Sequence, residues 1–237
     1  MKRVLAYLLS FGVFICCPHS YSQDNPVMHY LQKASEYAEI YNGKMETPYN
    51  PAIYENLPYF MNDDYTETAI TYRKNSYPGQ RARLDLYREQ LILMLPEKRY
   101  GIIVDPRYVD KVTMYNKSFI WLTPPKDSKL KAGYYILSLE GENIQLLCKE
   151  IITTNSKNES HNVISYFIRK QRFYVACNDR YYQVKKAGSF AKIFPEHKRQ
   201  INMFTRYNGL NFRQYKEDSM AVLAGYCDEL ITSNDKQ

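Results

Sequence analysis

The sequence has little of the material from which catalytic and metal sites are commonly built. Its 237 residues include only 4 histidines, 5 cysteines and 1 tryptophan. His29, His161 and His197 follow the N-terminal apolar run, and none stands in an HExxH pattern or beside a Cys, Asp or Glu at metal-ligand spacing. GxSxG, GxGxxG, P-loop and SxxK patterns are also missing. These absences exclude the common zinc, nucleotide and serine-hydrolase motifs, so we expect no catalytic residue, no metal site and no cofactor.

A second long apolar run is missing as well. Val4 to Cys17 form an apolar run of 14 residues behind the basic pair Lys2 and Arg3. This is shorter than the ~20 residues that a membrane-spanning helix needs. The pattern predicts a secretory signal peptide over residues 1–22 and a mature chain without a transmembrane segment.

The expected cleavage lies between Ser22 and Gln23, because Ser20-Tyr21-Ser22 supplies small residues there. A lipoprotein signal is the competing interpretation, since Cys16 and Cys17 end the apolar run. Neither cysteine follows a small residue, which favours ordinary cleavage. We therefore expect an exported protein in the periplasm, at the outer membrane or outside the cell.

Charge of one sign is not concentrated enough to indicate a nucleic-acid partner. Loss of the signal peptide takes the formal net charge from +7 to +5, with 30 basic and 25 acidic side chains. Much of the excess lies between Arg180 and Lys216, where a solvated helical face is the simplest interpretation. Nucleic acid is not expected as a partner.

Three cysteines remain in the mature chain, an odd number for an oxidising compartment. Cys148 and Cys177 share strand faces with apolar residues, and Cys227 lies on an apolar helical stripe. Small buried side chains are the expectation for all three. A Cys148–Cys177 disulfide is the main alternative.

What is present is a series of short strands. In the run from Arg81 to Tyr87, apolar and polar residues alternate, so Arg81, Arg83 and Asp85 should face water. Breaks at Tyr77-Pro78-Gly79 and Asn178-Asp179, among others, recur every 8 to 12 residues. This spacing predicts an antiparallel meander over residues 66–186, with a polar mobile loop at 153–162. The residues expected to share one hydrophobic interior are Leu84, Leu86, Leu93, Val112 and Met114.

Helices are expected at both ends of the meander. Periodicity predicts an N-terminal helix over 26–41 and C-terminal helices over 189–208, ending before Gly209, and 216–231. The aromatic segment from Lys44 to Asp64 should be an ordered loop that lies across the β core. The expected fold is α+β, mainly β, as one domain over 23–237 in the form of a curled sheet, a sandwich or an open barrel.

Tyrosine is the compositional excess, with 24 residues against 10 phenylalanines. Half-exposed strand positions favour tyrosine, and so do binding surfaces, because the ring is apolar and its tip is polar. Carboxylate pairs such as Asp63-Asp64, or Glu140 with Glu142, lie at turns where acidic residues are common. Their spacing does not indicate an acid–base pair.

Two stretches resemble a group of uncharacterised exported proteins of Gram-negative bacteria. The first contains Ile40-Tyr41-Asn42-Gly43, Leu57-Pro58-Tyr59-Phe60, Ile70-Thr71-Tyr72 and Leu84-Asp85-Leu86-Tyr87. The second runs from Phe190 to Leu210 and is followed by Phe212. The resemblance implies export, an α+β architecture and one domain, and it implies no activity.

Two classes of function follow from these observations. The first is a non-enzymatic envelope protein that binds a partner protein or a glycan through aromatic β surface or loops. The alternative is an envelope hydrolase whose site is assembled from distant loops. A tyrosine surface without converging titratable groups would favour binding, and a pocket that holds two carboxylates, or Cys beside His, would favour hydrolysis.

Overall fold

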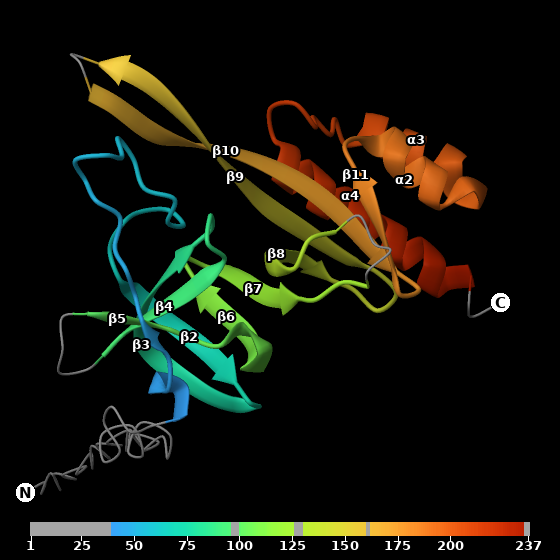
Figure 1. Ribbon diagram of the computed structural model, residues 1–237. Coiled ribbons are helices and arrows are strands. Elements are labelled where there is room, and N and C mark those ends of the chain that lie inside the picture. The colour runs from blue at the N-terminus through green and yellow to red at the C-terminus, as the bar shows by residue number, and fades with distance from the viewer. Residues whose placement is uncertain (1–38, 96–99, 126–129, 160–161, 235–237) are drawn as a thin grey trace, which may run out of the picture.

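The computed structural model describes residues 39–95, 100–125, 130–159 and 162–234 (Figure 1). The expected signal peptide and most of the expected helix 26–41 lie outside these residues. The described end of that helix, Glu39–Tyr41, forms a 3-10 turn, η2. Among the described residues, no helix combines the length and the apolar character that crossing a membrane requires.

The described strands form one antiparallel sheet of eleven strands, which is open because β1 and β11 lie at its two ends. The order across the sheet is β1-β5-β4-β3-β2-β6-β7-β8-β9-β10-β11, so most neighbours in sequence are neighbours in space. The mainly-β meander predicted from the sequence is confirmed in this open form. The strands are β1 (Lys44–Met45), β2 (Thr66–Tyr72), β3 (Asn75–Asp85), β4 (Gln90–Met94), β5 (Gly101–Ile103), β6 (Val109–Met114), β7 (Lys117–Leu122), β8 (Gly133–Glu140), β9 (Gln145–Glu159), β10 (Asn162–Cys177) and β11 (Arg180–Val184).

The predicted break at Tyr77-Pro78-Gly79 is wrong, because β3 runs straight through it. The pairing of β2 with β3 shifts register between Thr68 and Ile70, opposite this stretch. Gly79 has a φ of +66°, and a proline supplies no ladder donor, so both residues suit a bulge better than regular pairing. By contrast, the hairpin turn at Asn178-Asp179 is confirmed, with φ angles of 49° and 58°.

The predicted loop at 153–162 is also wrong, because β9 and β10 continue through it as a long hairpin arm. Figure 1 shows this arm projecting beyond the rest of the sheet. Its edge is held by the 53–56 segment, since Glu55 N donates to Ser165 O and Ser165 N donates to Ile53 O, each at 2.9 Å. Residues 153–158 of β9 are exposed on both faces of this arm, so they do not alternate between polar and apolar types as the residues of a half-buried strand do.

Three α-helices are described, all after the last strand: α2 (Ala187–Ile193), α3 (Lys198–Tyr207) and α4 (Lys216–Asn234). The helix expected over 189–208 is two helices, separated by the 3-10 turn η4 (Pro195–His197). Phe194 has non-helical dihedral angles (φ −120°, ψ 72°), as expected of a residue that precedes proline. The predicted helix at 216–231 is confirmed as most of α4.

The five residues predicted to share an interior do so. Leu84, Leu86, Leu93, Val112 and Met114 are each at most 3% exposed and belong to one apolar cluster. The same cluster extends to the helices through residues such as Phe190, Ile201 and Leu223. One face of the sheet therefore forms the main core, and α2, α3 and α4 cover its C-terminal part.

The three cysteines among the described residues, Cys148, Cys177 and Cys227, are free, so the alternative of a Cys148–Cys177 disulfide is wrong. Cys148 on β9 lies opposite Phe173 on β10. Phe173 precedes Cys177 by four residues, so the two cysteines are separated by about 13 Å along the strand direction. Cys148 and Cys227 are buried as predicted, while Cys177 is only half-buried.

Candidate functional site

The residues that the sequence offered for chemistry do not converge. His29 and His161 lie outside the described residues, and buried His197 has its Nδ1 2.9 Å from Gln200 Oε1. Asp63 and Asp64 are exposed in the loop before β2. The described part of the chain contains no group of three or more His, Cys, Asp and Glu side chains that could hold a metal ion.

Glu140 and Glu142 flank the turn between β8 and β9, and Asp228 of α4 lies beside this turn. Asp228 accepts hydrogen bonds from the backbone N–H groups of Glu142, Asn143 and Ile144 at 2.8 to 2.9 Å. Its carboxylate is therefore used to hold the turn against the helix. This arrangement explains the position of the acidic residues without invoking catalysis.

The strand alternation fails at Arg83 and Asp85, which were expected to face water. Asp85 is fully buried and the Arg83 side chain is 15% exposed. The 44–65 segment covers this face of the sheet, as predicted for the loop, and it brings Tyr49 and Tyr59 onto the strand. Sequence reasoning missed these buried charges; the cluster of tyrosines in the covering loop was the one available signal.

Each buried charge on this face has partners within the chain. Arg83 donates two hydrogen bonds to Glu46, at 2.7 and 2.9 Å, and its guanidinium lies 4.2 Å from the centre of the Tyr59 ring. The hydroxyl groups of Tyr59 and Tyr65 also donate to Glu46, each at 2.9 Å. Burial raises the pKa of Tyr65 to about 12, and the Glu46 carboxylate adds to the shift.

The buried carboxylate of Asp85 also has hydrogen-bond partners within the chain. Burial raises the pKa of its carboxyl group, and hydrogen bonds from Arg88 N, the Tyr49 hydroxyl and Tyr87 N oppose that shift, each at 2.9 Å. The Arg88 guanidinium lies 3.8 Å from the centre of the Tyr49 ring. Asp85 therefore fixes the turn between β3 and β4 and binds the covering loop to it.

A third buried pair joins that turn to β9. Lys149 Nζ donates to Glu89 Oε1 at 2.6 Å and to Tyr134 O at 2.8 Å, while Tyr134 N donates to Glu89 Oε2 at 2.8 Å. Burial raises the pKa of Glu89 and lowers the pKa of Lys149, and their mutual attraction opposes both shifts. None of these charged residues lines the cleft described below, so we assign them to the scaffold.

The surface that is open to a ligand lies at the far end of the sheet. Strand β11 pairs with β10 on one side, and among the described residues no strand pairs with its other side. Along this strand lies an open cleft of about 980 Å³, here called the β11 cleft. The side chains that matter most to its chemistry are Arg172, Tyr174, Arg180, Tyr181, Tyr182 and Lys192.

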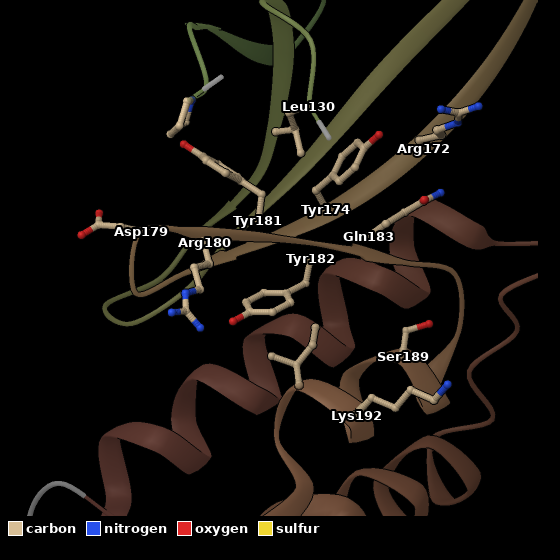
Figure 2. A pocket seen from close by; sticks show the side chains of 12 residues that line it. Leu130, Arg172, Tyr174, Asp179, Arg180, Tyr181, Tyr182, Gln183, Ser189 and Lys192 are labelled. Carbon is tan, nitrogen blue, oxygen red and sulfur yellow. The ribbon is translucent and has the colours of Figure 1, made fainter. Parts of the chain in front are cut away.

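The β11 cleft reaches both faces of its strand. Figure 2 shows Tyr181 on the same side of the strand as Tyr174, and Tyr182 on the opposite side, toward α2. Tyr181 and Tyr182 are half-buried, so each ring keeps one surface free, whereas Tyr174 is 7% exposed and packs in a small apolar cluster with Tyr135. Asp179 is the one carboxylate among the described residues that line the cleft.

A second hollow of about 680 Å³ adjoins the first, and Arg172 and Gln183 line both. It is basic, and the described residues that line it include no acidic side chain. We call its cations the basic cluster: Lys170, Arg172, Lys185, Arg213 and Lys216. Sequence reasoning assigned the basic excess between Arg180 and Lys216 to a solvated helical face. Three cations of that range, Lys185, Arg213 and Lys216, instead lie in this hollow beside Lys170 and Arg172 of β10.

Comparison with models of known protein families, with curated proteins and with solved structures finds no match for this chain. Functional argument therefore starts from the geometry of the β11 cleft and the basic cluster.

Proposed function

We propose that this protein is an exported, non-enzymatic envelope protein that binds an extended segment of a partner protein along the free edge of β11. The observation that carries the proposal is the edge of β11 that no described strand pairs with, inside a cleft with tyrosines on both sides of the strand. An exposed strand edge presents unpaired N–H and C=O groups that another chain can pair with.

The dimensions of the site suit strand addition. The five residues of β11 span about 17 Å in an extended strand. In this mode of recognition, main-chain hydrogen bonds provide affinity and alternate side chains enter pockets on the two faces. Tyr181 offers a ring on one face and Tyr182 on the other, so successive side chains of a bound segment each meet an aromatic surface.

A peptide fits these features better than a glycan does. Tyrosine rings alone would suit a sugar, since they provide flat apolar surface with a polar tip. A sugar, however, cannot complete a row of backbone groups spaced as a β-ladder. The unpaired edge therefore favours an extended polypeptide, and glycan binding is an outcome that the experiment below can distinguish.

The charges of the site support binding over the hydrolase alternative. Among the described residues that line the β11 cleft, Asp179 is the one carboxylate, and it lies in the exposed turn before β11. A hydrolytic site would need a nucleophile or a general base with a group to orient it. The buried carboxylates of Glu46 and Asp85 and the half-buried carboxylate of Glu89 are instead engaged by tyrosines, cations and backbone N–H groups of the chain itself.

The proposal that the protein is exported depends on the basic start and the apolar run at the N-terminus. Cleavage after Ser22 predicts a mature chain that begins at Gln23. Intact-mass measurement of the protein purified from the cell envelope tests this. A chain that retains residues 1–22 would contradict export by cleavage, and a lipid adduct on Cys16 or Cys17 would favour the lipoprotein alternative.

Peptide display tests the binding site. The purified chain from Gln23 onward is screened against a library of random twelve-residue peptides and, in parallel, against an array of envelope polysaccharides. We expect peptides to be enriched and their affinity to fall at least tenfold in the double variant Tyr181→Ala/Tyr182→Ala. The matched control is Tyr207→Ala/Tyr215→Ala, which removes two exposed helix-side tyrosines and should leave affinity unchanged.

N-methylation of a selected peptide then tests the mode of binding. In strand addition only every second peptide N–H points at the edge strand, so methylation should weaken binding at alternate positions. Uniform effects at all positions would overturn strand addition. Polysaccharide binding without peptide binding, or turnover of a screened compound, would overturn the proposed function.

A further inference from the structure

The basic cluster brings together five cations from four parts of the chain. Lys170 and Arg172 belong to β10, Lys185 follows the end of β11, Arg213 lies in the link between α3 and α4, and Lys216 is the first residue of α4. Four of them are exposed and Lys216 is half-buried. Like charges that line one hollow repel each other, and this repulsion lowers the stability of the fold unless a bound anion offsets it.

The chain supplies little counter-charge to this hollow. None of the ion pairs among the described residues includes a member of the basic cluster. Two acidic residues lie close to the cluster in register or in sequence. Glu150 is buried and lies opposite Gln171 in the β9–β10 ladder; its Oε1 accepts from Gln171 Nε2 at 2.8 Å, and its Oε2 has no hydrogen-bond partner among the described residues. Glu217 pairs with Lys117 at 2.6 Å. Lys216 is half-buried, with its Nζ 5.2 Å from the centre of the Phe173 ring, and the four exposed cations of the cluster are available to an external anion.

The position of the cluster ties it to the strand-addition site. Arg172 and Gln183 line both hollows, so the basic cluster continues the β11 cleft at the C-terminal end of the strand. Beyond Val184 the chain turns away toward α2. A segment paired along β11 would leave the strand at that point and pass directly over Lys185 and Arg172.

We propose that the basic cluster recognises carboxylates of the bound segment, so that the partner is an extended peptide that is acidic at one end. This inference rests on the proposed function and adds the chemical class of the partner. If the segment pairs antiparallel to β11, its acidic residues lie at its N-terminal end; if it pairs parallel, they lie at its C-terminal end. The proposed ligand is a peptide and not a free polyanion, because the hollow of the basic cluster adjoins the cleft along the β11 edge.

Synthetic peptides test this charge preference separately from strand addition. Three peptides share an eight-residue alternating Thr-Val core and carry three added residues: glutamates before the core, glutamates after it, or glutamines before it. Binding is followed by fluorescence anisotropy at 50 mM and 500 mM NaCl. We expect one glutamate peptide to bind at least tenfold more tightly than the glutamine peptide at low salt. Its advantage should shrink at high salt, because the screening length falls well below 10 Å.

Charge-removing variants locate the effect. Lys185→Gln/Arg213→Gln should weaken the preferred glutamate peptide by roughly two- to fivefold for each cation removed and leave the glutamine peptide unchanged. The matched control, Lys198→Gln/Arg199→Gln, removes the same charge from exposed positions on α3 outside the cluster. Lys170→Gln/Arg172→Gln serves as a second test variant if the first unfolds.

The outcomes distinguish the acidic-partner inference from the proposed strand addition on which it rests. Equal binding of all three peptides, with no effect of the cluster variants, would overturn the acidic-partner inference and leave strand addition standing. Failure of every peptide to bind would overturn both. Tighter binding of heparin or single-stranded DNA than of any peptide, lost in Lys185→Gln/Arg213→Gln, would show a free-polyanion site and also overturn the inference.

Discussion

Replacement of Arg83 by methionine should destabilise the protein strongly, although the strand pattern places Arg83 on a water-facing position. The Arg83 side chain is 15% exposed and its partner Glu46 is 2% exposed. Arg83 contributes two hydrogen bonds to Glu46, at 2.7 and 2.9 Å, and covers the Tyr59 and Tyr65 rings at 4.2 and 4.5 Å. Methionine keeps some of the contact with the rings and removes the charge.

The expected loss is about 3–5 kcal/mol, the cost of leaving one member of a buried ion pair without its partner. This is a large share of a total stability of ~5–15 kcal/mol. Urea denaturation measures it as a lower midpoint with an unchanged slope. Arg81→Met is the control, because Arg81 lies on the same face of β3 but is exposed, with one hydrogen bond to Tyr65 O at 2.8 Å. It should change stability by no more than ~1 kcal/mol.

A double variant isolates the cause. If the buried charge of Glu46 is what destabilises Arg83→Met, then Glu46→Gln combined with Arg83→Met should recover part of the loss. Equal, small effects of Arg83→Met and Arg81→Met, with no coupling to Glu46→Gln, would refute the reasoning and return Arg83 to the solvent face.

Three further predictions concern the scaffold. Leu84→Ala should cost ~2–5 kcal/mol and lower the melting temperature clearly, since Leu84 is fully buried. Gly133→Ala should destabilise too, because a Cβ there would lie 2.5 Å from Lys149 Nζ and 2.6 Å from Glu89 Oε2 at a φ of +150°; melting that matches the wild type would contradict this. Alkaline unfolding, followed by tyrosinate absorbance, should be cooperative at about pH 11–12. Above pH 10 the unfolded chain releases phenolic protons that the folded chain retains, so stability falls by roughly 5 kcal/mol per pH unit for four such groups. Gradual titration near pH 10 would contradict it. The four buried tyrosines with raised pKa are Tyr49, Tyr59, Tyr134 and Tyr135.

Much of the main core was determined by the sequence itself. Alternation in β3 and β6 placed Leu84 and Val112 in one interior, because a strand that buries one face repeats its apolar residues at period two, and the continuous apolar run of β4 placed Leu93 there too. Local signals also marked turns and helix ends correctly, such as Gly209, whose φ is +60°. These features depend on short-range geometry, which neighbouring residues decide.

Alternation failed where a distant segment changed what a polar face meets. Arg83 and Asp85 are polar residues on the face opposite the main core, which the pattern assigns to water. The 44–65 segment covers that face and satisfies both charges with carboxylate and hydroxyl groups. The alternation of polar and apolar residues in β3 cannot report these partners, because Glu46 lies 37 residues from Arg83 and Tyr49 lies 36 residues from Asp85.

The candidate site is likewise a product of tertiary structure. The sequence contains Tyr181, Tyr182 and the cations, but nothing local says that β11 is the last strand of the sheet or that Arg213 and Lys185 meet. The order of strands in the sheet decides that the edge of β11 has no described partner strand. The packing of α4 and of the link before it decides that Arg213 and Lys216 lie near the end of that strand. Both arise from long-range contacts, so the residues were visible in the sequence while the surface they form was not.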